Sequence, residues 1–272
     1  VRKSSGLFGR KAFDFSGLSV NLSVLLVWII LVWLGLFLVF SYDPGAVVNS
    51  DGRPANWIER LYFTGYILST LGIGNFKPTS GFFEIMTSLF SFFGFIFFTS
   101  AMTYLISVSS AVTVKRTLAR TISNLGKHPQ PIAEKLQSLD RRYYLNQLLS
   151  LQELIDKHIV NHQAYPVVHF FSNSTKQACL SLNLARLDEA VSYLLVLEKE
   201  NSDELQLLQG TITNLLEHID QNYGRHMFKT PGVDSYSSMP VKLEEVARQE
   251  LEGRRAIVGG MLRSEGLHWS DV

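Results

Sequence analysis

Cysteine is almost absent from this sequence, since Cys179 is the single one among 272 residues. One thiol excludes an intrachain disulfide framework and any CxxC metal site. The residues around Cys179 follow a helical pattern, in which burial is the usual state of a cysteine. We therefore assign no function to it.

Motifs of the common enzyme classes are also missing. No GxGxxG, P-loop, HExxH or GxSxG pattern occurs, and no nucleophile, base and orienting group stand in a recognisable arrangement. Residues 115–272 balance 18 Lys and Arg against 19 Asp and Glu, which gives no electrostatic basis for a nucleic-acid partner. We expect that the protein is not an enzyme, has no cofactor and binds no nucleic acid.

Charge is absent from two long stretches of the chain. No charged residue occurs from Phe15 to Tyr42 or from Ile85 to Val114. Both stretches exceed the roughly 20 apolar residues that cross a hydrocarbon core. The first is also too long for a signal peptide, and no small-residue cleavage site follows it. Two membrane spans are predicted, over 18–41 and 82–114.

Basic residues flank both predicted spans on the sides that face the chain ends. Such residues favour the cytoplasm, and two crossings return the chain to the side from which it started. We expect a multi-pass protein of the plasma or inner membrane with both termini cytoplasmic. The flanking residues are Arg2, Lys3, Arg10, Lys11, Lys115, Arg116 and Arg120.

The segment between the spans combines a turn-rich loop with a short apolar helix. Pro, Gly, Asn and Asp cluster over residues 41–56, as in exposed turns. Asn56 then stands three residues before Glu59, a capping-box arrangement, at the start of a predicted helix over 57–69. A helix of this length would span roughly 20 Å, too little to cross a membrane. The chain must therefore turn back, as a re-entrant helix and loop.

The loop after that helix reads Thr70-Leu71-Gly72-Ile73-Gly74-Asn75. Non-helical backbone at membrane depth is tolerated where protein surrounds it or where it lines a water-filled path. Gly72 and Gly74 can adopt backbone angles that turn successive carbonyls toward one axis. Such carbonyls can replace the hydration shell of an ion, and the negative C-terminal end of the short helix favours a cation. A plain extracellular glycine turn is the alternative.

Span, turn-rich loop, short helix, TLGIGN and second span together resemble the two-transmembrane potassium channel family over about residues 10–116. The family's filter pattern is T-V-G-Y-G-D. The resemblance implies that Thr70 forms the innermost ion site, that Leu71, Gly72 and Ile73 supply further carbonyls, and that Gly74 is the outer glycine. It also implies four loops around one ion, and hence a homotetramer with permeant potassium ions in its filter.

Three residues depart from the family pattern. Ile73 replaces the usual Tyr, so the hydrogen bond from its phenol to the pore helix is lost. Asn75 replaces the usual Asp, and Tyr66 stands where some members carry a Glu that pairs with that Asp. Potassium selectivity is the expectation, with weakly selective cation conduction as its rival, because the packing that sets the filter's diameter must differ.

Hydroxyl residues follow one stripe of the second predicted span. Thr99, Thr103 and Ser107 are spaced by four residues, with Phe98 beside them, which is expected of a helix face that lines a pore. Hydrogen bonds to their own helix would explain the same residues. Gly94 lies where the family often has a hinge glycine, and close packing is its alternative role.

The remainder of the chain reads as a bundle of helices, with apolar residues three and four positions apart. His158 and His162 are spaced by four residues, which can hold a metal ion, although exposed histidines on a solvated helix face would look the same. A regulatory ligand of unknown kind is a candidate for binding to this part. The predicted division is a cytoplasmic or interfacial segment 1–17, a pore domain 18–114 with filter 70–75, a cytoplasmic helical domain 115–226, and a linker with a last helix over 227–272.

The sequence thus predicts an all-α membrane protein with two transmembrane helices, a re-entrant pore helix and filter loop, and a cytoplasmic helical bundle. The predicted function is a tetrameric cation channel, potassium-selective, with the helical domain as a candidate regulator of opening. A membrane-anchored signalling or scaffold protein that keeps the pore fold without conducting is the alternative from another class.

Overall fold

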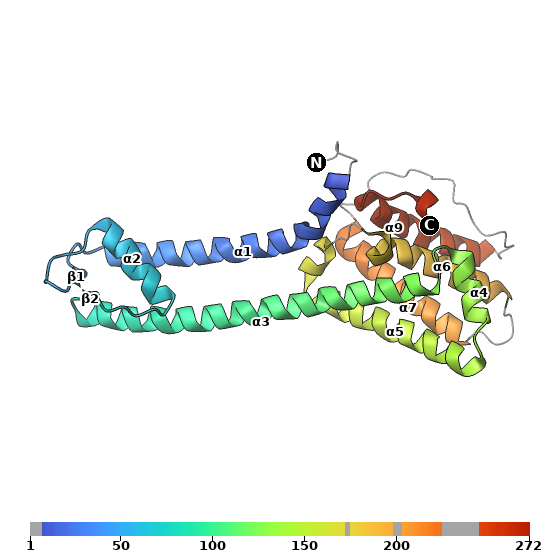
Figure 1. Cartoon of the computed structure of the whole chain (residues 1–272), viewed down its shortest axis with the longest axis horizontal. Helices are drawn as coiled ribbons and strands as arrows, with labels where there is room; N and C mark the ends of the chain where they lie inside the picture. Colours follow the sequence, from blue (N-terminus) through green and yellow to red (C-terminus); the bar gives the residue numbers. More distant parts are fainter. Residues whose placement is uncertain (1–6, 172–174, 198–202, 225–244) are drawn as a thin grey trace. The chain divides into compact units, whose positions relative to one another are not determined.

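The computed structural model describes residues 7–171, 175–197, 203–224 and 245–272. The chain is an all-α membrane protein, in which the described residues form helices, turns and one small two-stranded sheet (Figure 1). It divides into a membrane unit, Leu18–Ser107, and a helical unit that contains Val108–Val272. Two helical segments are long and apolar enough to cross a membrane, Ser19–Ser41 and Gly81–Leu125.

The second of these helices continues beyond its apolar run. Helix α1 covers Leu7–Ser41 and helix α3 covers Gly81–Leu125, whereas the predicted second span ended at residue 114. The extension is explained by Leu118, Ala119 and Ile122, which are fully buried in the core of the helical unit. One continuous helix therefore belongs to both units.

Helix α2, Trp57–Leu68, begins with the capping box that the sequence predicts. The Glu59 backbone N–H donates to the Asn56 side chain at 3.0 Å, and the Asn56 N–H donates to the Glu59 carboxylate at 2.7 Å, so two orphan donors of the first turn are satisfied. Trp33 of α1 donates its indole N–H to the Leu61 carbonyl at 3.1 Å. Gly65 faces the Trp33 ring, where an added Cβ would lie only 3.3 Å away. The outer helix thus holds α2 in place.

The turn-rich loop contributes one strand to a small antiparallel sheet that the sequence pattern did not predict. Strand β1, Val47–Asn49, pairs antiparallel with strand β2, Phe76–Pro78. Thr79 adds a hydroxyl hydrogen bond to the Gly45 carbonyl at 2.6 Å. The segment after α2 is therefore tied back to the segment before it, and the loop in between is fixed at both ends.

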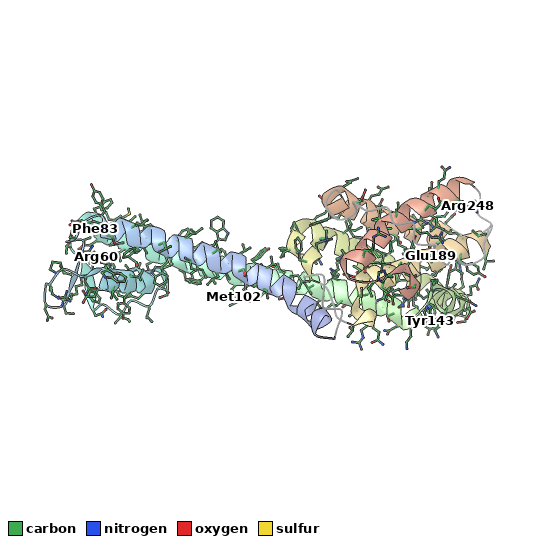
Figure 2. The ribbon with its side chains drawn as sticks, turned by 90° about the horizontal axis from the view of Figure 1, so that it is seen from above. Arg60, Phe83, Met102, Tyr143, Glu189 and Arg248 are labelled. Atoms are coloured by element: carbon green, nitrogen blue, oxygen red, sulfur yellow. The ribbon has the colours of Figure 1, made fainter. Side chains whose placement is uncertain are left out.

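The helical unit is built around helix α6, Leu180–Leu197, which is buried on every side from Leu180 to Ser192. A helix surrounded in this way is the centre of its bundle. Glu189, labelled among the bundle helices in Figure 2, lies on this helix. The other elements are α4 (Pro129–Gln137), α5 (Arg141–Ala164), η1 (Pro166–Phe170), η2 (Lys176–Ala178), α7 (Asp203–Ile219), the π-helical turn η3 (Asp220–Gly224), α9 (Glu245–Ser264) and η4 (Trp269–Asp271).

The last helix is part of this bundle, whereas the sequence division placed it in a separate segment, 227–272. Val258, Met261 and Leu262 of α9 join the same core as α6. Arg255 donates two hydrogen bonds to the Glu189 carboxylate, Nε to Oε1 at 2.6 Å and Nη2 to Oε2 at 2.7 Å. Sequence periodicity finds the helix but not its docking, which depends on partners that are distant along the chain. The predicted linker, 227–240, lies outside the described residues.

Replacing Arg255 by Met is expected to destabilise the helical unit by about 3–5 kcal/mol, because it leaves the buried Glu189 carboxylate without its partner. Chemical unfolding of the full chain in detergent, followed by circular dichroism, measures the change. Arg248→Met is the matched control, since Arg248 is on the same helix and exposed (Figure 2), and such a change costs under about 0.5 kcal/mol. Equal stability of the two variants would contradict a structural role for the pair.

Candidate functional site

The loop Thr70–Asn75 is anchored at its inner end by the last turn of α2. The Thr70 N–H donates to the Ile67 carbonyl at 2.9 Å, and the Leu71 N–H donates to the Tyr66 carbonyl at 2.9 Å. The negative end of the helix macrodipole lies at the same place. The first residues of the loop therefore stand directly at an electronegative helix terminus, which favours a cation.

The backbone of this loop alternates in handedness. Thr70, Gly72 and Gly74 have φ values of 57°, 58° and 81°, and Thr70 is the only non-glycine residue with positive φ in the part of the chain that the structure describes. Leu71 and Ile73, between them, are not in this region. In an extended strand successive carbonyls point to opposite sides, and inverting every second residue turns them toward one side. The glycines at 72 and 74 provide this at little steric cost.

A phenol braces the outer end of the loop. Tyr66 of α2 donates its hydroxyl to the Phe76 carbonyl at 2.8 Å, and Ser50 donates to the Asn75 carbonyl at 3.3 Å. The Tyr66 ring packs edge-on against Phe63, with centroids 5.3 Å apart. Tyr66 of the short helix α2 thus supplies a phenol, whereas position 73 of the loop has none. This phenol binds the backbone of β2.

The loop itself is exposed in a single chain. Residues 69–75 are all solvent-exposed, and the side chains of Leu71 and Ile73 are 64% and 51% exposed. Non-helical backbone in a membrane needs protein or a water-filled path around it. The loop therefore requires further copies of the chain beside it if it lies at membrane depth.

Gly94 of α3 meets the end of α2 in a contact that only glycine permits. A Cβ at Gly94 would lie 2.0 Å from the Leu68 carbonyl oxygen, a separation that no side chain shift can relieve because the oxygen belongs to the backbone. The sequence offered a hinge or close packing for this residue. The observed contact is close packing against Leu68, which lies two residues before the loop begins.

The predicted hydroxyl stripe makes hydrogen bonds within its own helix. Thr99 donates to the Phe95 carbonyl at 2.8 Å, and Thr103 donates to the Thr99 carbonyl at 3.0 Å. Phe98, Thr99 and Thr103 are exposed in the single chain, and Ser107 is half-buried. Phe98, Thr99 and Thr103 are thus available to line a pathway. Pore lining by these three residues and Ser107 stays a prediction.

The two spaced histidines are buried, contrary to the solvated helix face that the sequence offered. His158 and His162 are 1% and 3% exposed, because α5 turns this face toward η1 and α7. His162 uses its two ring nitrogens on two different histidines, His169 and His218, so no single ion reaches all three rings. The described residues contain no group of three or more His, Cys, Asp or Glu side chains arranged to hold a metal ion.

Comparison with known proteins decides the class of the membrane unit. A family model described as an ion channel matches residues 23–111, from within α1 through the loop to α3. Residues 23–111 are thus similar to an ion-channel domain, and we refer to them below as the ion-channel domain. The match includes the alternating loop, its anchor on α2 and the Gly94 contact, and it points to transport rather than catalysis.

The whole chain, and not the ion-channel domain alone, has a counterpart elsewhere. A Bacillus subtilis (strain 168) protein described as an uncharacterized membrane protein, YdjJ, is 27% identical over 282 residues, which cover 98% of this chain and 82% of the relative. No solved structure matches the chain. The alignment thus extends over both the ion-channel domain and the helical unit of this chain.

Two parts of the ion-channel domain's site were missed from the sequence. The antiparallel sheet of β1 and β2 has strands of three residues each, too short for a period-two pattern. The Tyr66 brace was missed because its acceptor is a backbone carbonyl, which has no signature in the sequence. A tyrosine on the buried side of a short helix in a membrane was the available signal, since a buried phenol needs a partner.

Proposed function

We propose that the protein is a homotetrameric, potassium-selective cation channel whose filter is the loop Thr70–Asn75. The carrying observation is the alternating handedness at Thr70, Gly72 and Gly74, in an exposed loop between two fixed ends. Rows of backbone carbonyls turned toward an axis are how potassium filters replace an ion's hydration shell. Four loops around one axis complete the ring, as the resemblance to the potassium channel family implies.

The permeation path would continue along α3, past Phe98, Thr99, Thr103 and Ser107. Both chain ends lie in the cytoplasm in this arrangement, and the membrane is the cell's plasma or inner membrane. The helical unit is then the cytoplasmic domain, attached to the pore through the continuous helix α3. Any ligand that binds two arrangements of this domain unequally biases the pore.

The test is a planar-bilayer recording of the purified protein, with potassium on one side and sodium on the other. A reversal potential near the potassium equilibrium value supports a selective filter, and one near zero supports the weakly selective cation pore. Silence with protein shown to be tetrameric and correctly inserted would favour the non-conducting scaffold.

The variant Gly72→Ala is expected to abolish selective current. An alanine at φ 58° is strained by roughly 1–2 kcal/mol in each chain, and relief of that strain would turn the carbonyl away. Gly35→Ala is the matched control, because an added Cβ at Gly35 of α1 meets nothing within 4 Å. Current and reversal potential are measured for both, and a Gly72→Ala channel with wild-type selectivity would refute the filter assignment.

A further inference from the structure

The inner end of α3 is attached to the helical unit through the short helix η1. Lys115 of α3 is 7% exposed and donates its ammonium group to the Val168 carbonyl at 3.2 Å and to the Phe171 carbonyl at 2.7 Å. One turn earlier, Val112 packs in a small apolar cluster with Val168. A buried ammonium without these two carbonyls would be strongly destabilised, so η1 holds the turn of α3 around Lys115, whereas the next turns are anchored in the core through Leu118, Ala119 and Ile122.

The helix η1 is itself held by a chain of histidines, which we call the histidine cluster: His158, His162, His169 and His218. His162 Nε2 lies 3.3 Å from His169 Nδ1, and His162 Nδ1 lies 3.1 Å from His218 Nε2. The His169 ring also stacks on Tyr223 of η3, with centroids 3.9 Å apart and an interplanar angle of 3°. Tyr223 in turn donates its hydroxyl to the Pro166 carbonyl at the start of η1.

The hydrogen bonds that link His218, His162 and His169 can be directed in only one way. Asn222 donates its amide nitrogen to the His218 backbone carbonyl at 2.7 Å and lies 3.2 Å from His218 Nδ1, so His218 Nδ1 is an acceptor. His218 Nε2 must then donate to His162, and His162 Nε2 must donate to His169. The acceptor nitrogens of His218, His162 and His169 are thus occupied, whereas Nδ1 of His158 is buried without a hydrogen-bond partner. A proton added to His218, His162 or His169 therefore breaks one of these hydrogen bonds.

Charge and burial both oppose that proton. Burial lowers the pKa of His162 to about 3, with His169, Lys115 and His218 adding to the effect, and burial followed by Lys115 lowers the pKa of His169 to about 4. Burial also lowers the pKa of His158 and His218. Among the described residues, the groups that lower these pKa values through their charge are Lys115 and the other histidines of the cluster.

The remaining charges near this attachment act on Lys115. Burial lowers the pKa of Lys115. Glu265, beyond the end of α9, and the Cys179 thiol at the start of α6 oppose this shift, whereas Arg116 of α3 adds to it. Glu265 is the carboxylate of this set, and it also accepts a hydrogen bond from the Cys179 thiol at 2.7 Å. Protonation of the histidine cluster therefore adds positive charge opposite Lys115, with Glu265 bound elsewhere.

We propose that the histidine cluster is a proton-controlled attachment of α3, which releases η1 from Lys115 when the rings are protonated. Its effect on conduction rests on the proposed channel function, because α3 is one helix from Gly81 to Leu125. A histidine that has a low pKa when attached and about 6.5 when released takes up its proton on release. The attached arrangement is therefore stable above pH 6.5 and is lost as the pH falls below that value.

The size of the effect follows from these pKa values. For His169, lowered to about 4 when attached, acidification from pH 8 to pH 5.5 shifts the equilibrium by about tenfold toward the released arrangement. Each further histidine of the cluster that regains an ordinary pKa adds a similar factor. A response over two pH units is therefore expected to be steep and to begin just below pH 6.5.

A fluorophore on η1 tests the release directly. Phe170→Cys places a thiol on an exposed position of η1, and bimane attached there in the full chain, in liposomes, reports movement. The native Cys179 will not compete, since burial raises its pKa to about 12 and the thiol form is unreactive. Fluorescence and potassium flux are recorded from pH 8 to pH 5.5 on the side of the helical unit.

Expected is a fluorescence change with a midpoint below pH 6.5 and a flux that changes by about tenfold over the same range. His169→Gln and His162→Gln should each weaken both responses, and the double variant should weaken them most, because glutamine cannot titrate. His128→Gln is the matched control, since His128 is exposed and bonds to Val272 outside the cluster. Lys115→Met should weaken the dependence on pH, because it removes a positive charge that lowers the pKa values of His162 and His169 in the attached arrangement.

Three results would each contradict one part of the proposal or the channel function on which it rests. Identical pH profiles for the wild type and the single and double glutamine variants would overturn the attachment. A fluorescence response with flux that does not change with pH would overturn its control of the pore. A fluorescence response in a protein with no flux at any pH would support the attachment and contradict the proposed channel function.

Discussion

Replacing Gly94 by alanine is expected to abolish selective ion flux in the assembled protein. The added Cβ would lie 2.0 Å from the Leu68 carbonyl oxygen and 3.0 Å from the Leu68 carbonyl carbon. Both atoms are backbone, so either α2 or α3 must move by more than an ångström to clear them. Overpacking of this kind costs typically about 1–3 kcal/mol in each chain, and Thr70 follows Leu68 by two residues. The displacement therefore falls on the loop.

Selectivity distinguishes this contact from a hinge at the same residue. A hinge glycine replaced by alanine stiffens α3 by about 1 kcal/mol and changes opening while the loop stays intact. Close packing at Gly94 predicts the reverse. The alanine variant either loses selectivity in every channel that opens or fails to assemble. Gly81→Ala is the matched control on the same helix, since a Cβ there meets nothing within 4 Å. Reversal potentials and the oligomeric mass in detergent are measured together, and wild-type selectivity in Gly94→Ala would exclude the contact.

Replacing Tyr66 by phenylalanine is expected to lower the preference for potassium over sodium by about five- to tenfold. The change keeps the ring and its packing on Phe63 but removes the donor to the Phe76 carbonyl, 2.8 Å away. The lost hydrogen bond is worth about 1–1.5 kcal/mol, and the half-buried carbonyl loses its donor. The outer end of the loop is then free to widen, and the packing around a filter contributes to its selectivity.

Tyr42→Phe serves as the control, because it removes a phenol from a side chain that is 90% exposed in the same unit. The permeability ratio from bi-ionic reversal potentials is the quantity to compare. If Tyr66→Phe keeps the wild-type ratio while Gly72→Ala loses it, the loop is held by its inner anchor and the aromatic packing alone. That outcome would falsify the role of the phenol and leave the filter assignment standing.

The membrane unit was accessible from the sequence because its signals are local. A charge-free run, a capping box and a pair of glycines each lie within one short stretch, and the structure has helices and positive φ values at those places. The Gly94 contact could not be predicted from the sequence, because it joins α3 to a carbonyl of α2. The loop and strand β2 separate the two helices along the chain. Spacing cannot tell a hinge from a contact with backbone.

The helical unit was accessible only as a set of helices. His158 and His162 look the same in sequence whether their face meets water or η1, and the choice depends on how the chain folds after α5. Likewise, Arg254 and Arg255 of α9 look like a solvated pair until Asp188 and Glu189 of α6 stand opposite them. Long-range partners of buried charges carry no local pattern.

The loop between α2 and β2 has a further consequence for the energetics of any ion that enters it. The segment Thr70–Asn75 starts from hydrogen bonds on Tyr66 and Ile67 and ends at strand β2, which pairs with β1. Chain ends that are already fixed leave a short segment little conformational entropy to lose. An ion would therefore meet a site that is organised before it arrives, so that little of its binding free energy is spent on ordering the protein. Fast exchange of ions through such a site requires no folding and unfolding of the loop.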